Sequence, residues 1–289
     1  MVNDNHKGKV SGTRIFRTIV CVIMCFLAVI PFYILIINST LRHSDIASGI
    51  KLIPGNQFIT NIKNMFTPGK QIVSTFSIID AFRNSVIITV PTTILQVYFG
   101  ALTAYAVTAY NFKFKNLAWA FIYGIMMIPT QVSIVGLIQV TQVTGMYGTF
   151  WPLILPAIAA PTTVYFMKQY MESSLSLEIV EAGRIDGCGE FGIFNKIVLP
   201  LLKPAMATQA IFAFVASWNN LYTPSILLGS NRKLSTLPMY AEAIRSNDKI
   251  PDLGQAYAAM LLAILPIIIA YLCLSKYIIA GVALGGVKE

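Results

Sequence analysis

The stretch EAGRIDGCGEFGIFNKIVLPLLKP (residues 181–204) separates two long apolar runs and differs from both in composition. It is rich in small residues and contains Pro200 and Pro204. Five of the 12 acidic residues of the chain lie in it or just before it: Glu172, Glu178, Glu181, Asp186 and Glu190. A short polar turn is the commoner connection between two packed helices, so this acid-rich loop indicates a function of its own.

The rest of the chain has the composition of a membrane protein. Of its 289 residues, 56% are hydrophobic and 11% are charged, and the mean hydropathy is +0.68. Soluble domains carry about 25% charged residues. The net charge of +9 suits the anionic inner face of a bilayer. We see no pattern of basic and aromatic residues that indicates nucleic acid, so we expect an all-α membrane protein that contacts lipid.

Charge-free apolar runs predict where the chain crosses the membrane. The run 18–37 follows a basic N-terminal segment and is too long for the apolar centre of a cleaved secretory signal. The run 116–167 is long enough for two helices, and its polar, glycine-containing centre at 139–148 predicts a turn. We expect six transmembrane helices, at 18–37, 84–112, two within 116–167, 204–231 and 253–275.

The distribution of basic residues predicts the orientation of these helices. With the N-terminus inside, the short inner turn 113–115 holds two lysines, whereas the short outer turn 139–149 holds no basic residue. We therefore expect both termini in the cytoplasm, together with a loop over residues 172–204 between the fourth and fifth spans. In this division, residues 1–83 form the cytoplasmic N-terminus, the first span and an extracellular loop, and residues 84–289 form the transmembrane core.

The sequence lacks the residues of several kinds of active site. No ionisable residue falls inside an expected span, whereas ion-coupled carriers use such groups at membrane depth. Neither a phosphate-binding loop nor a hydrolase motif occurs. Cys21 and Cys25 share one helix face but lack further ligands, so we expect packed core cysteines and no metal site. We therefore expect no catalytic residue and no cofactor bound by this chain, and another subunit must supply the energy for transport.

Local signals predict a helix in the acid-rich loop. Ser176 is a suitable N-cap, and Glu178 then lies in the first turn, where the helix dipole favours an acid. Gly187 is suited to end the helix in a left-handed conformation. The loop therefore has the signals of a helical hairpin.

The second arm of the loop carries Phe191, Phe194 and Ile197, which predict an apolar stripe. A hairpin that lies on the lipid surface is one interpretation, but such segments favour Lys and Arg. An acid-rich hairpin is repelled by anionic lipid. We therefore favour a protein partner that pushes the loop as a lever, and small residues along the loop would let its backbone approach that partner closely.

The same residues resemble the Glu-Ala-Ala…Gly…Ile-x-Leu-Pro loop of bacterial ABC importer permeases. The matching positions are Glu181, Ala182, Asp186, Gly187, Phe194, Ile197, Leu199, Pro200 and Pro204. Gly183 and Cys188 each replace another small residue of the motif. The likeness extends from about residue 83 to the end, and the segments 216–220, 235–238 and 281–288 are similar to the carbohydrate-uptake branch. Within that branch, the chain resembles the smaller permease of the maltose type.

This resemblance implies that the loop docks in a cleft of a cytoplasmic ATPase dimer, which would bind ATP and Mg²⁺. Closure of that dimer would switch the transporter between inward- and outward-facing states. The residues to which the resemblance assigns the contact are Glu181, Ala182, Gly183, Asp186, Gly187, Phe194, Ile197, Leu199 and Pro200. A second homologous permease would pair with this chain. An extracellular solute-binding protein would deliver the substrate, with residues 38–83 and 232–252 as candidate docking surfaces.

Four polar or aromatic residues near the end of the fifth span are possible substrate-pathway residues. They are Trp218, Asn219, Asn220 and Tyr222. Aromatic rings stack on sugars and amides form hydrogen bonds with them. Polar residues also join membrane helices to one another, and we expect this packing role to be the commoner one.

We therefore expect a multi-pass permease subunit of an ATP-driven ABC importer in the bacterial cytoplasmic membrane, with a carbohydrate, most simply an oligosaccharide, as substrate. The same architecture serving a non-sugar solute is an alternative. A secondary carrier would need coupling-ion ligands and an inverted repeat, neither of which we find. An intramembrane enzyme would need a nucleophile and a base within the spans.

Overall fold

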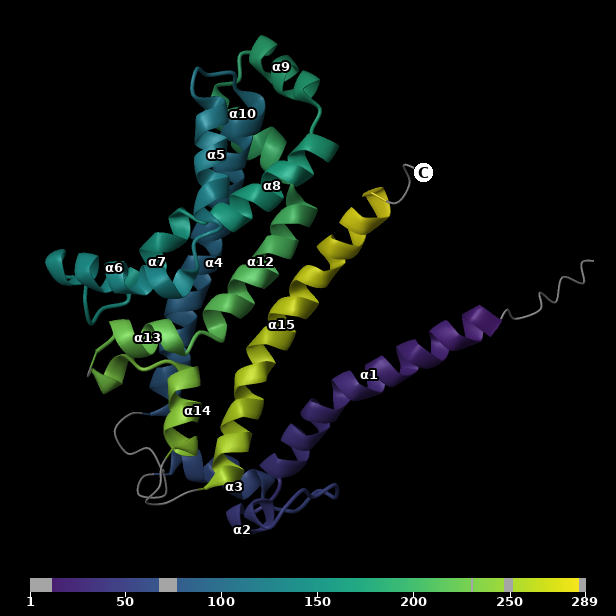
Figure 1. Cartoon of the computed structure of the whole chain (residues 1–289), viewed down its shortest axis with the longest axis vertical. Coiled ribbons are helices and arrows are strands. Elements are labelled where there is room, and N and C mark those ends of the chain that lie inside the picture. The colour runs from purple at the N-terminus through teal and green to yellow at the C-terminus, as the bar shows by residue number, and fades with distance from the viewer. Residues whose placement is uncertain (1–11, 68–76, 230, 247–251, 286–289) are drawn as a thin grey trace, which may run out of the picture. The chain divides into compact units, whose positions relative to one another are not determined.

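The computed structural model describes residues 12–67, 77–229, 231–246 and 252–285. All regular structure in these residues is helical (Figure 1). The chain divides into two compact units, one of residues 1–72 and 244–261 and the other of residues 73–243 and 262–289. The division that we expected after residue 83, between an N-terminal segment and a transmembrane core, stays a prediction.

A few long helices alternate with many short ones. In chain order the elements are α1 (Gly12–Ser39), α2 (His43–Ala47), α3 (Phe58–Phe66), α4 (Ile78–Ala109), α5 (Lys115–Ile125), α6 (Thr130–Val143), α7 (Trp151–Ile154), η1 (Leu155–Ile158), α8 (Pro161–Ser174), α9 (Leu177–Ile185), α10 (Glu190–Ile193), the π-helix η2 (Phe194–Val198), α11 (Leu199–Leu201), α12 (Lys203–Trp218), α13 (Tyr222–Leu227), η3 (Arg232–Leu234), α14 (Leu237–Arg245) and α15 (Leu253–Gly285).

Three described helices are long and apolar enough to cross a membrane: Gly12–Ser39, Ile78–Ala109 and Leu253–Lys276. A fourth candidate is α12 together with the segment Glu190–Leu201, which meets it at an angle of 82°. The described residues therefore hold three or up to four such helices, where the sequence predicted six. The all-helical membrane architecture is confirmed, and the spans expected within 116–167 and at 204–231 account for the difference.

Prolines lie at the breaks that divide the run 116–167 into shorter helices. Proline removes a backbone donor and clashes with the preceding turn. The chain breaks between α5 and α6 just before Thr130, at Pro129, and α8 begins at Pro161. The turn expected at 139–148 begins later, because α6 continues to Val143. The reversal is made instead by Gly145 and Gly148, whose φ angles are 71° and 75°.

The fifth expected span ends earlier than residue 231. α12 stops at Trp218, and the Asn220 side chain accepts a hydrogen bond from the backbone N–H of Thr223 at the start of α13. Asn side chains favour such local bonds over a continued helix. The polar residues after Trp218 therefore divide the run into two helices.

In the first unit, Asn61 joins α3 to the end of α1. Its side-chain amide donates to the carbonyl oxygens of Ser39 and Leu41 at 2.9 and 3.0 Å. The start of α15 packs against the same place, because a Cβ on Gly254 would lie only 2.5 Å from the Leu41 carbonyl oxygen. A glycine is therefore required there for close packing.

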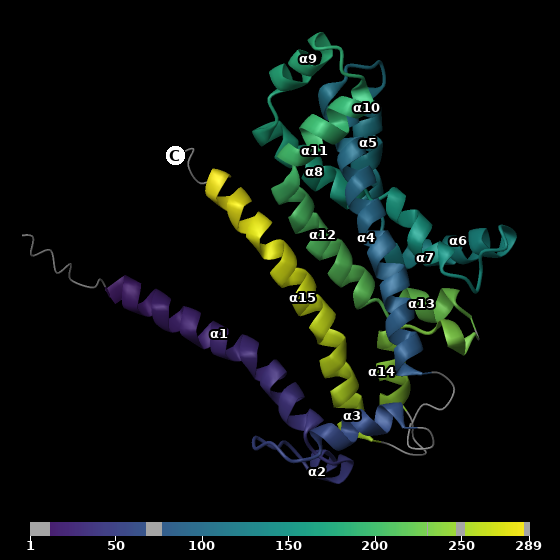
Figure 2. The ribbon, with the colours of Figure 1, turned by 180° about the vertical axis from the view of Figure 1, so that it is seen from behind.

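The second unit is built around α4. Near its start, the Asn84 amide donates to the carbonyl oxygens of Lys233 and Ser235 at 2.8 and 3.0 Å. Near its middle, a Cβ on Gly100 would lie 2.6 Å from the Thr163 side chain, so α8 approaches α4 closely there. α12 packs on α4 as well, and Figure 2 shows these helices side by side.

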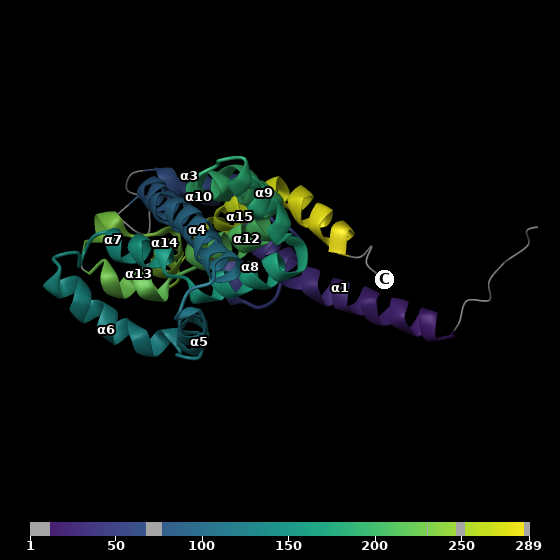
Figure 3. The same ribbon diagram turned by 90° about the horizontal axis from the view of Figure 1, so that it is seen from above.

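The apolar core of this unit lies where α4 and α8 meet the segment from α9 to α11. Its buried members are Val97, Ala101, Ala104, Tyr105, Val164, Met167, Met171, Leu175, Val180, Ile193, Phe194, Val198 and Leu202. Figure 3 looks down on this end of the unit, with α9 and α10 near α8 and α4 and with α6 at the edge. The core therefore holds the acid-rich loop against α4 and α8 of its own unit.

Candidate functional site

The first arm of the acid-rich loop is α9, and its ends largely follow the sequence signals. Ser176 occupies the N-cap position with extended backbone angles, although its side chain makes no capping hydrogen bond. Gly187 has a φ of 77°, as predicted. The N–H of Gly187 donates to Arg184 O, and that of Cys188 donates to Gly183 O, both at 3.0 Å. This pair of bonds is a Schellman motif, which ends α9 and reverses the chain.

The inner face of α9 packs on the second arm of the loop. Val180 is 1% exposed, and Gly183 is buried. A Cβ at Gly183 would lie 2.9 Å from Ile197 Cδ1 and 3.3 Å from Ile193 Cγ1. The glycine that departs from the resembled motif therefore allows close packing of the two arms.

The second arm runs from α10 through the π-helix η2 to α11 and then bends by 82° into α12. The π-helical turn η2 is of a kind common at functional sites. In α11, Pro200 has no backbone N–H to donate to the preceding turn. The bend lies at Leu202, between Pro200 and Pro204, where we predicted that the chain turns into the next span. We name residues 177–198, from α9 to η2, the hairpin.

The predicted apolar stripe of the second arm is wrong at one position. Phe194 is 1% exposed and packs against the rings of Tyr98 and Tyr105, at centroid distances of 5.7 and 5.5 Å. Phe191, in contrast, is 68% exposed. The inward positions of this arm are 193, 194, 197 and 198, and its inward face does not include Phe191.

A polar network ties the hairpin to the end of α4. Arg184 donates to Glu190 through Nε at 2.7 Å and through a terminal nitrogen at 3.3 Å. The Tyr110 hydroxyl donates to the same carboxylate at 2.5 Å, and the Arg184 guanidinium lies 5.5 Å from the centre of the Tyr110 ring. These groups belong to three separate elements: α9, α10 and the residue that follows α4.

The network shifts the pKa values of the two charged groups, which lie in the loop outside the spans expected from the sequence. The Arg184 guanidinium, followed by the Tyr110 hydroxyl, lowers the pKa of Glu190 below its usual value of 4.5. The hydrogen bonds to Glu190 raise the pKa of Arg184. Both groups are therefore charged at neutral pH.

The outer face of the hairpin mixes acids with large apolar side chains. Its exposed acids include Glu178, Glu181 and Asp186. The exposed apolar residues are Leu177, Ile179, Ile185 and Phe191, of which Ile185 is 86% exposed. Large apolar side chains grouped on a surface are typical of a binding face. An acid-rich surface does not suit anionic lipid.

The predicted coupling residues divide between the two faces of the acid-rich loop. The exposed ones are Glu181, Ala182, Asp186, Gly187 and Pro200. The ones that face inward, fully or in part, are Gly183, Phe194, Ile197 and Leu199. The inward residues support the hairpin from within, and the exposed ones lie where a partner can reach them.

Sequence reasoning missed the network of Tyr110, Arg184 and Glu190. Arg184 and Glu190 are six residues apart, which is not a helical spacing, so only the turn at Gly187 brings them together. Tyr110 precedes Glu190 by 80 residues, and no local signal links the two. The number of acidic residues in the loop was the one sequence feature that pointed to this network.

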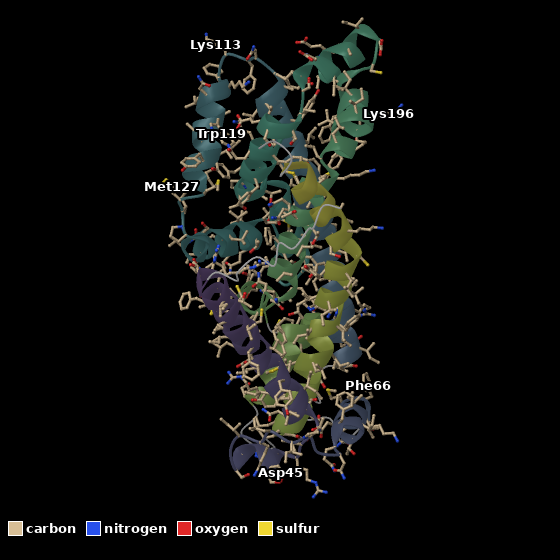
Figure 4. The ribbon with its side chains drawn as sticks, turned by 90° about the vertical axis from the view of Figure 1, so that its right-hand side faces the viewer. Asp45, Phe66, Lys113, Trp119, Met127 and Lys196 are labelled. Carbon is tan, nitrogen blue, oxygen red and sulfur yellow. The ribbon has the colours of Figure 1, made fainter. Side chains whose placement is uncertain are left out.

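Basic and aromatic residues gather at the same end of the unit as the hairpin. Lys113 lies in the turn after α4, and Figure 4 shows it at that end, with Trp119 below it on α5. The Lys168 ammonium lies 4.4 Å from the centre of the Trp119 ring and forms an ion pair with Glu172. The lysine-bearing turn and the acid-rich loop were both predicted on the inner side, and the second unit brings them together.

The possible pathway residues have several different environments. Trp218 is 2% exposed, donates its indole N–H to Ala263 O at 2.9 Å and stacks on Phe214. This burial supports the helix-packing role for Trp218. Asn219 and Tyr222 are exposed, and the Asn220 side chain accepts a hydrogen bond from Thr223 N–H at the start of α13.

A cavity of about 750 Å³ lies between α4 and α7. Its lining is mostly apolar and includes Ile87, Pro91 and Ile94 of α4 and Trp151 and Ile154 of α7. None of the four possible pathway residues lines it. The cavity does not combine those residues into a sugar site.

The cysteines do not pack as expected. Cys21, Cys25, Cys188 and Cys273 are all exposed. The prediction of core cysteines is wrong for Cys21 and Cys25, because the most apolar stretch of α1 has no buried residue. The described part of the chain contains no group of three His, Cys, Asp or Glu residues arranged to hold a metal ion.

Parts of the candidate docking segments lie outside the described residues. Within 38–83 these are residues 68–76, and within 232–252 they are residues 247–251. The same holds for residues 286–288 of the C-terminal resemblance. Their proposed contacts stay predictions.

Comparison with known proteins identifies relatives of the whole chain. Residues 96–283 match the family described as the inner membrane component of binding-protein-dependent transport systems. The arabinooligosaccharides transport system permease protein AraQ of Halalkalibacterium halodurans is 34% identical over 272 residues, which cover 92% of this chain and 93% of AraQ. The melibiose/raffinose/stachyose import permease protein MelC of Bacillus subtilis is 33% identical, with 97% of this chain and 99% of MelC covered.

A relative with another named solute is the sn-glycerol-3-phosphate transport system permease protein UgpE of Yersinia pestis. It is 29% identical, with 93% of this chain and 96% of UgpE covered. Among solved structures, a bacterial ABC transporter involved in the import of the acidic polysaccharide alginate has a chain with a TM-score of 0.76 and 19% identity. The match covers 92% of this chain and 98% of that chain, and at this identity it shows the fold alone.

These matches cover more of the chain than the loop that first indicated a transporter. A binding-protein-dependent system implies a binding protein and an ATPase as partners. A secondary carrier and an intramembrane enzyme are therefore wrong as alternatives. The chain belongs to the family of inner-membrane components of binding-protein-dependent transport systems, as a multi-pass, non-catalytic permease of an ABC importer.

Proposed function

We propose that this permease imports an oligosaccharide and that its hairpin couples transport to ATP hydrolysis by a cytoplasmic ATPase dimer. The coupling part of the proposal rests on the outer face of the hairpin. That face offers exposed acids and large apolar side chains, while the inner face is packed into the core of the unit. A surface that is firmly supported from behind transmits a push, because packed cores deform little.

In this proposal the chain crosses the membrane six times, with both termini and the loop 172–204 in the cytoplasm. Helices broken by proline, such as α5 with α6, together complete spans that no single helix makes. ATP and Mg²⁺ are bound by the ATPase, and this chain holds no cofactor. A second, homologous permease completes the pathway, and a binding protein delivers the substrate from outside.

The proposed substrate rests on the relatives. AraQ and MelC are named for oligosaccharides and match nearly the full length of this chain. UgpE, named for sn-glycerol 3-phosphate, favours the alternative of a smaller, anionic solute. An anionic substrate needs cationic partners along its path.

The test is to co-express the chain with its chromosomal neighbours, purify it in mild detergent and identify the proteins that accompany it. We expect a second permease, two ATPase copies and, after reconstitution, ATP hydrolysis that the binding protein loaded with arabino- or galacto-oligosaccharides stimulates. Stimulation by glycerol 3-phosphate alone would replace the oligosaccharide with the anionic alternative. A chain that purifies alone and needs no ATPase for uptake would contradict the proposal.

A further inference from the structure

We propose that Tyr110, Arg184 and Glu190 form a clamp that makes the hairpin and α4 move as one body, so that displacement of α9 reaches the transmembrane helices. The inference rests on the proposed function. It assigns positioning roles to three residues to which the resemblance to ABC importer permeases gives no role. Arg184 lies on α9, Glu190 begins α10, and Tyr110 follows the last residue of α4.

The geometry of the clamp joins three elements through one carboxylate. Arg184 approaches Glu190 with two nitrogens, at 2.7 and 3.3 Å, and Tyr110 donates to the second oxygen at 2.5 Å. Two bonds in a planar fork fix orientation as well as distance. The guanidinium also lies over the Tyr110 ring, so the contact between α9 and the end of α4 is direct.

The hairpin needs such a tie because its turn is not held by packing. A Cβ at Gly187 or at Gly189 would meet no atom within 4 Å. α10 is a single turn, and the π-helix η2 follows it at once. Packing of Gly183 on Ile193 and Ile197 holds the inner faces of the two arms together, and the clamp ties the arms on the exposed side of the turn as well.

A second hydrogen bond ties the same hairpin to another position along α4. The Tyr98 hydroxyl donates to Asn195 Oδ1 at 3.1 Å, and the Asn195 amide donates to Phe191 O at 2.8 Å. Tyr98 and Tyr110 are 12 residues apart, which is about 18 Å along a helix. On the hairpin, the two ties end at Asn195 and Glu190, five residues apart, and two separate ties resist rotation of the hairpin about the end of α4.

The clamp is exposed enough that it adds little to stability. The side chains of Arg184 and Glu190 retain 36% and 46% of their accessible surface. Ion pairs at such positions contribute weakly to folding because water screens them. Loss of the clamp should therefore reduce coupling and leave folding and assembly nearly intact.

The experiment compares import with hydrolysis in one sample of the reconstituted complex, with the second permease, the ATPase and the binding protein present. We expect Glu190→Gln to reduce the number of substrate molecules imported per ATP by about fivefold, the order expected for the loss of a charge-assisted contact. Tyr110→Phe, which removes one hydroxyl and keeps the ring, should give a smaller loss of about twofold. ATP hydrolysis itself should persist in both variants.

Two further variants test whether coupling depends on the contact between Arg184 and Glu190 or falls with the loss of any ion pair. The charge-reversed pair R184E/E190R should recover part of the coupling that either single reversal loses. Glu172→Gln is the matched control, because it removes the same charge from an ion pair whose two partners both lie on α8. We expect the control to import as many molecules per ATP as the unchanged protein.

The outcomes distinguish the clamp from the proposed function. If the unchanged complex imports substrate and the clamp variants keep its import per ATP, the clamp proposal is overturned and the function stands. If the unchanged complex neither assembles nor imports, the function fails and the clamp fails with it. Should Glu190→Gln not assemble, Tyr110→Phe decides the question, because it deletes a single oxygen at the edge of the unit.

Discussion

The two faces of the hairpin are made by interleaved residues of the same short segment, yet they differ in burial and in the side chains that they carry. The inner face carries Val180, Gly183 and Phe194, all buried against the second unit's core. The outer face carries Glu181, Ile185 and Phe191, all exposed. Buried apolar contacts stabilise the fold, whereas exposed apolar groups leave surface free to bind a partner.

This difference shows why a residue motif does not by itself mark a binding surface. Gly183 and Phe194 belong to the resembled motif as much as Glu181 does, but they lie beneath the surface that a partner would touch. Substitutions on the inner face should therefore act on stability first. Substitutions on the outer face should act on assembly and coupling while the fold is kept.

The largest effect is expected from a pair of phenylalanines on opposite faces. Phe194→Ala removes a ring that is 1% exposed and leaves a cavity, so the free energy of unfolding should fall by about 3 kcal/mol. Phe191→Ala removes an exposed ring and should change it by less than about 0.5 kcal/mol. Denaturant unfolding of both variants in mixed micelles measures this. Equal losses would contradict the assignment of the two faces.

The turn between the faces gives the next effect. Gly187→Ala places a side chain at a φ of 77°, where no neighbour obstructs it but the backbone is strained, so stability should fall by about 1 kcal/mol. Gly192→Ala is the matched control: it lies in a helix with open space around it and should be neutral or stabilising by about 0.5 kcal/mol. The same sign for both would show that the left-handed turn is not maintained in the membrane.

A smaller effect should appear as coupling between Gly183 and Ile197. A Cβ at position 183 presses on Ile197 Cδ1 at 2.9 Å, and Ile197→Val removes that atom. A double-mutant cycle should therefore show that Gly183→Ala is better tolerated in the Ile197→Val background by about 0.5 kcal/mol. Additive changes would mean that the two arms do not pack as closely as the structure shows.

The smallest effect is the pH dependence of the ion pair. Because the folded-state pKa of Glu190 is lowered, its contribution is present above the unfolded pKa and is lost as the pH falls through the folded value. The stability difference between the unchanged protein and Glu190→Gln should stay constant from pH 7 to about pH 5 and shrink as the pH falls further below 4.5. Unfolding curves measured across that range test it, and a difference that grows on acidification would reverse the assigned sign.

The sequence predicts the long helices well because their signal is local. Charge-free runs identified both ends of α1 and α4 to within six residues and the start of α15, although α15 continues ten residues beyond its run. α4 begins six residues before its apolar run, where Ser77 caps the helix by accepting a hydrogen bond from Ile79 N–H. Whether a proline within such a run kinks a helix or ends it depends on packing, so the breaks at Pro129 and Pro161 were not predictable.

In the hairpin, the left-handed Gly187 was predictable because only the residue type and its place after a helix matter. Burial of Phe194 depends on its packing against Tyr98 and Tyr105 of α4, which no local sequence signal predicts. The bond from Tyr110 to Glu190 depends on tertiary packing between segments that are far apart in the chain. Local chemistry therefore predicted the turn, and only the fold showed which residues it brings together.

The most direct test of the central claim is a photo-crosslinking amino acid at position 185 of the assembled complex, since the Ile185 side chain is 86% exposed on the outer face. Position 180, on the buried face, serves as the control. The account predicts a covalent adduct between position 185 and the ATPase subunit, and none with that subunit from position 180. An active complex in which position 185 crosslinks only to lipid, or in which both positions reach the ATPase equally, would contradict it.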